Sequence, residues 1–230
     1  MKHVIPIVAA LSTVFSIPAW ADSPVVVELF TSQGCSSCPP ADKLFHQLAD
    51  REDVIALSLH VDYWDYIGWK DEFADPANAE RQRGYASVAG RRSIYTPQMV
   101  VNGTTDIVGT RPMALGKAIS EHAASPSPLD VSLVRDADEV VISAESNGVS
   151  GPLIVQMLRY SPVRSSKITR GENAGNTLEY SNVSEGWLIL GEWNGATPFE
   201  MRAKAEGDKP VVVLVQKGRN GPIVGAARLR

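Results

Sequence analysis

The fold of this chain is decided by residues 30–40, Phe30-Thr31-Ser32-Gln33-Gly34-Cys35-Ser36-Ser37-Cys38-Pro39-Pro40. The stretch begins at the end of an apolar run, residues 25–30, which is typical of a buried strand. It leads into residues 41–49, where apolar side chains recur at helical spacing. Residues 25–49 therefore predict a strand, a loop that holds the chain's two cysteines, and a helix.

The placement of the cysteine pair predicts chemistry. Two residues separate Cys35 from Cys38, so the two sulfurs can meet across a single turn. A helix N-terminus carries unpaired N–H groups and a partial positive charge, which favour a thiolate over a thiol. We expect Cys35, on the loop side, to be the more exposed, attacking thiolate and Cys38 to resolve the mixed disulfide. Because a residue before proline disfavours the α region, we expect the regular helix to begin near Pro40, with both sulfurs ahead of it.

Strand and helix patterns alternate on both sides of this stretch, up to about residue 124. Residues 54–60 are rich in β-forming side chains, and Asn102-Gly103 between two short apolar runs is typical of a hairpin. Residues 62–90 predict one or two helices, and residues 111–123 predict another. The first half is therefore predicted as a β-α-β-α-β-β-α unit.

Topology predicts which side chains meet. If the first two strands are parallel and the third is antiparallel to them, Cys35, the segment 60–62 and Thr96-Pro97 share one edge of the sheet. Together with this arrangement, the cysteine pair and Thr96-Pro97 resemble the thioredoxin superfamily over about residues 24–124. The resemblance implies that Pro97 is cis, that it faces the cysteines, and that Thr96 and Pro97 receive an extended substrate.

Three segments resemble a narrower group, a bacterial family of secreted thioredoxin-like proteins catalogued as domain of unknown function number twelve twenty-three. They are residues 30–42, residues 60–71 and Arg170-Gly171-Glu172-Asn173-Ala174-Gly175. This resemblance spans the chain downstream of residue 21 and implies the fold, but no substrate. The third segment is either a structured turn or a contact in which Glu172 and Asn173 dock against the first half.

Residues 1–21 have the features of a signal peptide. Lys2 precedes an apolar run, residues 4–17, and Ala19-Trp20-Ala21 fits a signal-peptidase site that cleaves after Ala21. The run is shorter than the about 20 residues that a membrane span needs, although a retained anchor is the competing interpretation. We expect a periplasmic or secreted protein in an oxidising compartment, without a membrane span after cleavage. A formal net charge of −4 argues against a nucleic-acid partner.

The second half has a different pattern. Residues 125–128, Ser-Pro-Ser-Pro, predict a linker, and seven short strand-like runs follow, separated by Gly, Asn, Asp and Pro. This spacing predicts an all-β, sandwich-like domain. The expected organisation is a signal peptide (1–21), a thioredoxin-like domain (22–124), a linker (125–128) and a β-sandwich-like domain (129–230).

Several residues near the predicted edge have two interpretations. His60 is either a structural imidazole or, like Asp62, a proton partner of the buried thiol. Aromatic side chains at 63–69, Trp64 among them, either fill the core or form a lid over the cysteines. Arg81, Arg83, Arg91 and Arg92 are expected on a solvated face, with an anionic peptide contact as the functional option.

Two functional hypotheses follow. The first is an exported enzyme of thiol–disulfide exchange that acts on protein or small thiols and disulfides without a cofactor or metal. The second is a non-enzymatic binding module for a partner protein or Cu(I). In the second hypothesis the cysteine pair is a structural bridge or, with His60 or Met99, a set of soft metal ligands. A structural bridge here constrains the unfolded chain little, because it closes a very small loop. The direction of redox chemistry and the oligomeric state are left open.

Overall fold

The computed structural model describes residues 23–125 and 127–230. The predicted signal peptide, residues 1–21, lies outside this range, as does Pro126 of the predicted linker. Among the described residues, no helix is long and apolar enough to cross a membrane.

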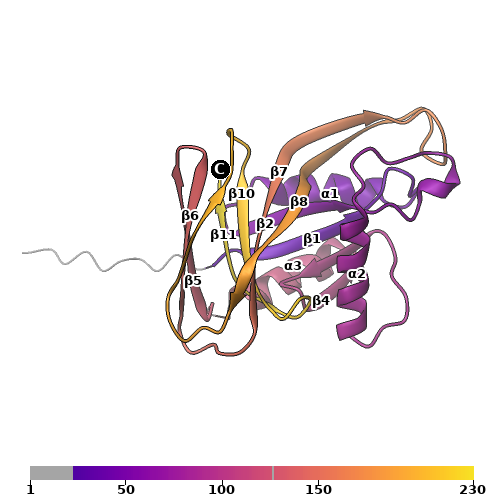
Figure 1. Ribbon diagram of the computed structural model, residues 1–230. Helices are drawn as coiled ribbons and strands as arrows, with labels where there is room; N and C mark the ends of the chain where they lie inside the picture. The colour runs from indigo at the N-terminus through magenta and orange to yellow at the C-terminus, as the bar shows by residue number, and fades with distance from the viewer. Residues whose placement is uncertain (1–22, 126) are drawn as a thin grey trace, which may run out of the picture.

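The helices and strands of the first half occur in the predicted order (Figure 1). They are β1 (Val25–Thr31), α1 (Pro39–Ala49), β2 (Val54–His60), the short 3-10 helix η1 (Asp65–Ile67), α2 (Pro76–Val88), β3 (Gln98–Val101), β4 (Thr105–Val108) and α3 (Pro112–Ala123). All three α-helices begin with proline. Proline suits the first turn, because an N–H group at this position would have no partner within the helix. Asn102 and Gly103 both have positive φ in the β3–β4 turn, which explains why this dipeptide predicts the hairpin.

The second half consists of seven strands, and each contains a run predicted from the sequence. They are β5 (Leu129–Asp136), β6 (Glu139–Ser146), β7 (Leu153–Lys167), β8 (Thr177–Trp193), β9 (Phe199–Lys204), β10 (Val211–Lys217) and β11 (Ile223–Leu229). Strands β7 and β8 have 15 and 17 residues, far longer than the runs that predict them. Together they form a hairpin that extends beyond the rest of the sheet (Figure 1).

The strands form a large mixed sheet of eight strands and a small sheet of three. The large sheet has the order β11-β10-β7-β8-β2-β1-β3-β4, and the small one has the order β5-β6-β9. As predicted, β1 and β2 are parallel, whereas β3 is antiparallel to β1. The junction between β2 and β8 is a parallel pairing of Ser58 with Val183. The large sheet therefore contains strands from both sides of the predicted linker.

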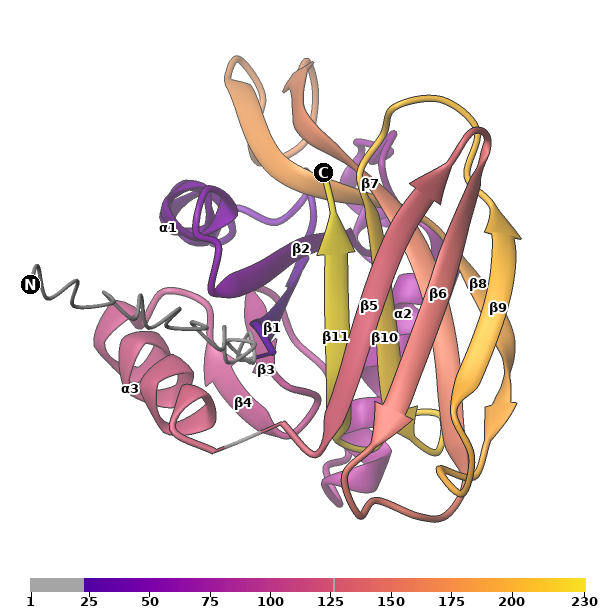
Figure 2. The same ribbon diagram turned by 90° about the vertical axis from the view of Figure 1, so that its left-hand side faces the viewer.

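Helices cover both faces of the sheet in the first half. Alternate residues of β1, such as Val27 and Leu29, pack against α1 and α3, while Val26 and Phe30 lie in the cluster on the α2 side. The cluster on the α2 side also contains Leu158 of β7 and Leu214 of β10, so it combines side chains from the two halves. The small sheet packs against β7, β10 and β11 through a separate apolar cluster (Figure 2).

A buried polar network joins the two halves on the α2 side of the sheet. We call it the Glu28 cluster, and its members are Glu28, Arg81, Tyr85, Gln156 and Gln216. Arg81 Nε lies 2.6 Å from Glu28 Oε1, and the guanidinium lies 4.3 Å from the centre of the Trp187 ring. The expectation of a solvated face is therefore wrong for Arg81, because the side chain is only 7% exposed. Its charge is instead balanced by Glu28 in the interior.

Candidate functional site

Cys35 and Cys38 form a disulfide at the amino end of α1, with their Cα atoms 5.4 Å apart. Cys38 is the residue that caps α1, and its carbonyl accepts hydrogen bonds from the N–H groups of Ala41 and Asp42. The helix begins at Pro39, one residue earlier than expected, and Cys38 itself has helical φ and ψ values of −78° and −37°. The preference of residues before proline for extended backbone is outweighed here by the first hydrogen bonds of α1.

Both cysteines are covered. Cys35 is 3% exposed and Cys38 is 0% exposed, while Ser36 and Ser37 between them are exposed. Cys35 is thus the more exposed of the two, as predicted, although both residues are buried. The hydroxyl of Ser37 lies 3.4 Å from the Cys35 sulfur.

Thr96 and Pro97 lie beside the cysteine loop, and the peptide bond between them is cis, as the resemblance implies. The Ser37 hydroxyl donates a long hydrogen bond, 3.5 Å, to the Thr96 carbonyl. Trp64 Nε1 donates to the Thr96 hydroxyl at 2.7 Å. Because β3 begins at Gln98, directly after this pair, the predicted edge of the sheet does bring Cys35 and Thr96-Pro97 together.

The aromatic segment after β2 packs against the same loop. A side chain at Gly34 would lie 3.3 Å from Trp64, and Trp69 Nε1 donates to Gln33 Oε1 at 2.6 Å. The Trp64 ring stacks on Tyr66, whose side chain is 79% exposed. This segment therefore packs on the cysteine loop and, through Trp64, against the apolar core, while Tyr66 forms an exposed aromatic surface.

His60 lies at the end of β2, fully buried, and pairs with a residue that sequence reasoning missed. Its Nδ1 lies 2.7 Å from Asp71 Oδ2, and neither side chain is exposed to solvent. Asp71 also accepts the backbone N–H groups of Gln33, at 2.8 Å, and Phe73, at 2.9 Å. His60 is thus paired with Asp71, which ties it to the cysteine loop, whereas Asp62 is half-buried. The signal was available: a buried imidazole needs an acceptor, and Asp71 ends the segment 60–71.

Asp42 is a second buried carboxyl that sequence reasoning missed. It follows Cys38 by one helical turn, so the two side chains lie on the same side of α1. The Thr31 hydroxyl donates to Asp42 Oδ1 at 2.8 Å. Burial raises the pKa of Asp42 to about 7, and the nearby Asp71 charge adds to the rise, while His60 and the Thr31 hydrogen bond oppose it. This carboxyl can therefore gain or lose a proton near neutral pH.

These groups form what we call the His60 cluster: Thr31, Asp42, His60, Asp71 and Tyr180. Tyr180, from β8, lies edge-on to His60 with a distance of 4.6 Å between ring centres. Burial raises the pKa of Tyr180. Within the described residues, His60 Nε2 and the Tyr180 hydroxyl are buried without a hydrogen-bond partner. Buried polar atoms are almost always paired, so each of these two atoms requires an explanation, and a role in proton transfer is one.

The Cu(I) hypothesis gains no support from the geometry. Met99 lies in the apolar cluster between the sheet, α1 and α3, and the two cysteine sulfurs are bonded to each other. Across residues 23–125 and 127–230, no three His, Cys, Asp or Glu side chains are grouped so that they could hold a metal ion.

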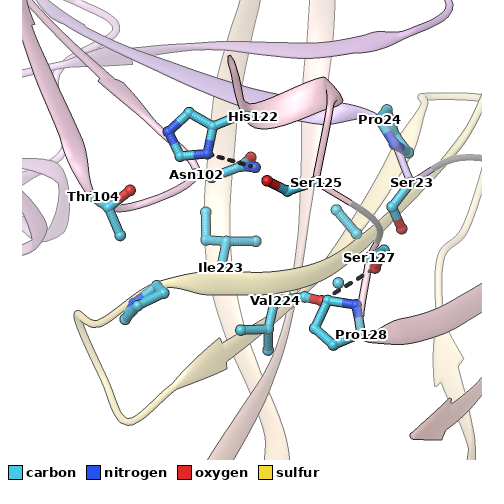
Figure 3. Close-up of a pocket in the computed structure, with 13 residues that line it drawn as sticks. Ser23, Pro24, Asn102, Thr104, His122, Ser125, Ser127, Pro128, Ile223 and Val224 are labelled. Carbon is cyan, nitrogen blue, oxygen red and sulfur yellow. Dashed lines mark hydrogen bonds between the residues drawn. The ribbon is translucent and has the colours of Figure 1, made fainter. Parts of the chain in front are cut away.

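A pocket of about 190 Å³ lies elsewhere, between the β3–β4 turn, the end of α3 and β11 (Figure 3). Asn102, His122 and Ser127 line it, together with Ile223 and Val224. Asn102 follows the last residue of β3, whereas Pro97 precedes the first. The pocket is therefore at the end of β3 opposite to the cysteines.

With this geometry established, comparisons place the chain in a family. Residues 26–216 match the family described as "Protein of unknown function (DUF1223)", and the chain belongs to it. A crystal structure of a protein from Agrobacterium tumefaciens is 31% identical, with a TM-score of 0.78 over 92% of this chain and 96% of that one. HBP35 of Porphyromonas gingivalis has a similar fold at 16% identity, with a TM-score of 0.62 over 90% of this chain and 75% of its own. No curated protein matches the sequence.

Proposed function

We propose that this protein is an exported thiol–disulfide oxidoreductase whose reacting atoms are the sulfurs of Cys35 and Cys38. The observation that carries the proposal is the disulfide at the amino end of α1, beside Thr96-Pro97 and above a cluster of buried titratable groups. A bridge with a purely structural role has no need of a carboxyl whose pKa lies near 7 one turn away.

The reaction follows from the disulfide form. A substrate thiolate attacks the Cys35 sulfur, the bond between Cys35 and Cys38 breaks, and Cys38 leaves as a thiolate. The second substrate thiolate then attacks the substrate sulfur of the mixed disulfide and releases Cys35. The substrate is oxidised by two electrons to a disulfide, the protein becomes a dithiol, and the two substrate protons end on the cysteines or in solvent. The same steps in reverse reduce a substrate disulfide.

Each neighbouring residue has a role in this proposal. The Cys35 thiolate is stabilised by the partial positive charge of the helix dipole at the start of α1. Asp42 exchanges a proton with the Cys38 thiol, and His60, held by Asp71, acts through the pKa of Asp42. The Thr96 carbonyl can replace its long contact with Ser37 by a hydrogen bond from an extended substrate. Trp64 holds Thr96 in place, and Asp62 has no contact that gives it a part.

We also infer that residues 22–124 are a thioredoxin-like unit and that residues 129–230 are a sandwich-like unit built onto its sheet. The parallel β1–β2 pair, the antiparallel β3 and the cis bond before it support the first. The apolar cluster between β5, β6, β9 and β7, β10, β11 supports the second.

The test is a pair of serine variants. Cys35→Ser should abolish insulin reduction and the reactivation of scrambled ribonuclease, because the attacked sulfur is gone. Cys38→Ser should accumulate mixed disulfides through Cys35, visible on non-reducing gels, and the double variant should accumulate none. Full activity of both single variants would overturn the proposal.

A further inference from the structure

The hairpin of β7 and β8 extends past the sheet as a long arm over α1 (Figure 1). The arm is anchored along its length: the Ser58 hydroxyl donates to the Ser181 carbonyl, and Asn182 Nδ2 donates to the Ala56 carbonyl. Closer to its end, the Ser166 hydroxyl donates to Glu72 at 2.6 Å. Beyond the last strand pair, Lys167 with Thr177, residues 168–176 form a separate tip.

The tip has its own internal hydrogen bonds. Ile168 and Asn176 are paired through the backbone at 2.9 Å, and the Gly175 N–H donates to the Ile168 carbonyl at 2.8 Å. Gly171 and Gly175 have positive φ, which glycine adopts without strain. Asn173 is 6% exposed, whereas its neighbours Glu172 and Ala174 are exposed. The tip is therefore a preformed turn that presents one polar side chain inward.

Asn173 is bound directly to the cysteine loop. Its Nδ2 donates to the Gln33 carbonyl at 2.9 Å and to the Cys35 carbonyl at 3.0 Å. Gly171 packs against Trp69, where a Cβ atom would make a tight contact of 3.2 Å with the Trp69 Cβ. The tip and the aromatic segment thus both contact the loop that holds Cys35, a residue that is 3% exposed.

We propose that the tip of the arm, residues 168–176, is a cover over Cys35 and that Asn173 is the residue that latches it shut. The proposal rests on the proposed function, because exchange with a protein substrate needs a sulfur that the substrate can reach. The Asn173 latch consists of two hydrogen bonds between neutral groups, and the tip is held besides by the buried Ile168 side chain and by the contact of Gly171 with Trp69. The rest of the arm is paired strand by strand. The tip is thus the part of the arm that can lift at least cost, and Asn173 is a positioning residue.

The experiment measures how fast the disulfide of the full chain is reduced by two reagents with the same dithiol group. One is dithiothreitol, and the other carries a polyethylene-glycol chain. Asn173→Ala should accelerate reduction by the bulky reagent about ten- to thirtyfold, which is the effect of losing two ordinary hydrogen bonds on the opening equilibrium. Reduction by dithiothreitol should change by no more than about threefold. Glu172→Gln, next to the latch but exposed, should change neither rate.

Asn173→Asp provides a second variant of the same size that lacks both N–H donors, and it should behave like Asn173→Ala. Equal acceleration for both reagents, or no acceleration for either, would overturn the cover. The assay needs no physiological substrate, so it separates the two proposals. If Asn173→Ala accelerates reduction by the bulky reagent only, but the protein performs no thiol–disulfide exchange, the proposed function is refuted and the cover is not. If the protein performs exchange, but the ratio of the two reduction rates is the same in the wild type and Asn173→Ala, the cover is refuted and the proposed function is not.

Discussion

The Glu28 and His60 clusters lie on opposite faces of β1, and both are buried, yet only one of them is fully hydrogen-bonded. In the Glu28 cluster the guanidinium of Arg81 is shared between Glu28, Tyr85 and Gln216. In the His60 cluster, His60 Nε2 and the Tyr180 hydroxyl have no partner among the described residues. The difference separates two uses of buried polar groups: the first fixes how the two halves pack, and the second keeps titratable groups available next to a disulfide.

The largest effect on stability should come from the fully paired cluster. Arg81→Met leaves Glu28 buried without its counter-charge and should lower the free energy of unfolding by about 3–5 kcal/mol in urea titrations. Exchange activity of the folded protein should be unchanged, because the pair lies on the other side of the sheet. A variant that also carries Glu28→Gln should lose less than Arg81→Met alone. A loss below about 1 kcal/mol for Arg81→Met would show that the ion pair behaves like a surface pair.

The His60 cluster should reveal itself through pH. The pKa of Asp42 in the folded protein, about 7, lies above its ordinary value of 3.8, so the folded state holds this proton more tightly. Between about pH 4 and pH 7 the unfolded chain has lost the proton and the folded protein has not. The contribution of Asp42 to the free energy of unfolding therefore falls as pH rises through this window, by on the order of a few kcal/mol, and is constant above it.

Asp42→Asn keeps an oxygen for the Thr31 hydroxyl and removes the proton. Urea titrations at pH 5 and pH 8 should show that the variant is more stable than the wild type at pH 8 and that the gap closes at pH 5. If the free energies of unfolding of the variant and the wild type change in parallel with pH, the pKa of Asp42 is not raised in the folded protein.

The smallest expected effect is on KM, and it comes from Trp64, which lies beside Thr96. Trp64→Phe keeps an aromatic ring beside Tyr66 but removes the hydrogen bond to the Thr96 hydroxyl, worth about 1 kcal/mol. We expect KM for a peptide dithiol to rise about fivefold with little change in kcat, measured by steady-state oxidation of the peptide. A fall in kcat at constant KM would instead mean that Trp64 acts on the cysteines.

The sequence predicted the parts of this molecule that depend on local patterns. Apolar runs and helical spacing identify β1, α1 and β2, and Asn102-Gly103 identifies the β3–β4 turn. The adjacency of Cys35 and Thr96-Pro97 also followed, because strand direction alone brings those chain positions to one edge. The seven strands of the second half were found for the same reason.

What the sequence could not supply were partners distant along the chain. Alternation in a strand shows that one face is buried, but not which strand lies beside it, so the junction of β2 with β8 was not foreseen. Arg81 is part of an arginine-rich stretch, which predicts a solvated face, because its counter-ion lies 53 positions earlier in the chain. For Asn173 the sequence left a turn and a docking contact open, and the contact with the Cys35 carbonyl spans 138 positions. Asp71 was missed although it is only 11 positions from His60.

The reduction potential of the Cys35–Cys38 pair distinguishes a disulfide that exchanges with substrates from a structural bridge. It is measured by equilibrating the full chain with glutathione buffers and quantifying the disulfide after alkylation. An exchanging pair should have a potential between about −270 and −120 mV, the range of proteins that exchange disulfides with substrates. A potential below about −300 mV, together with no exchange activity, would contradict the proposed function and leave the pair as a structural bridge.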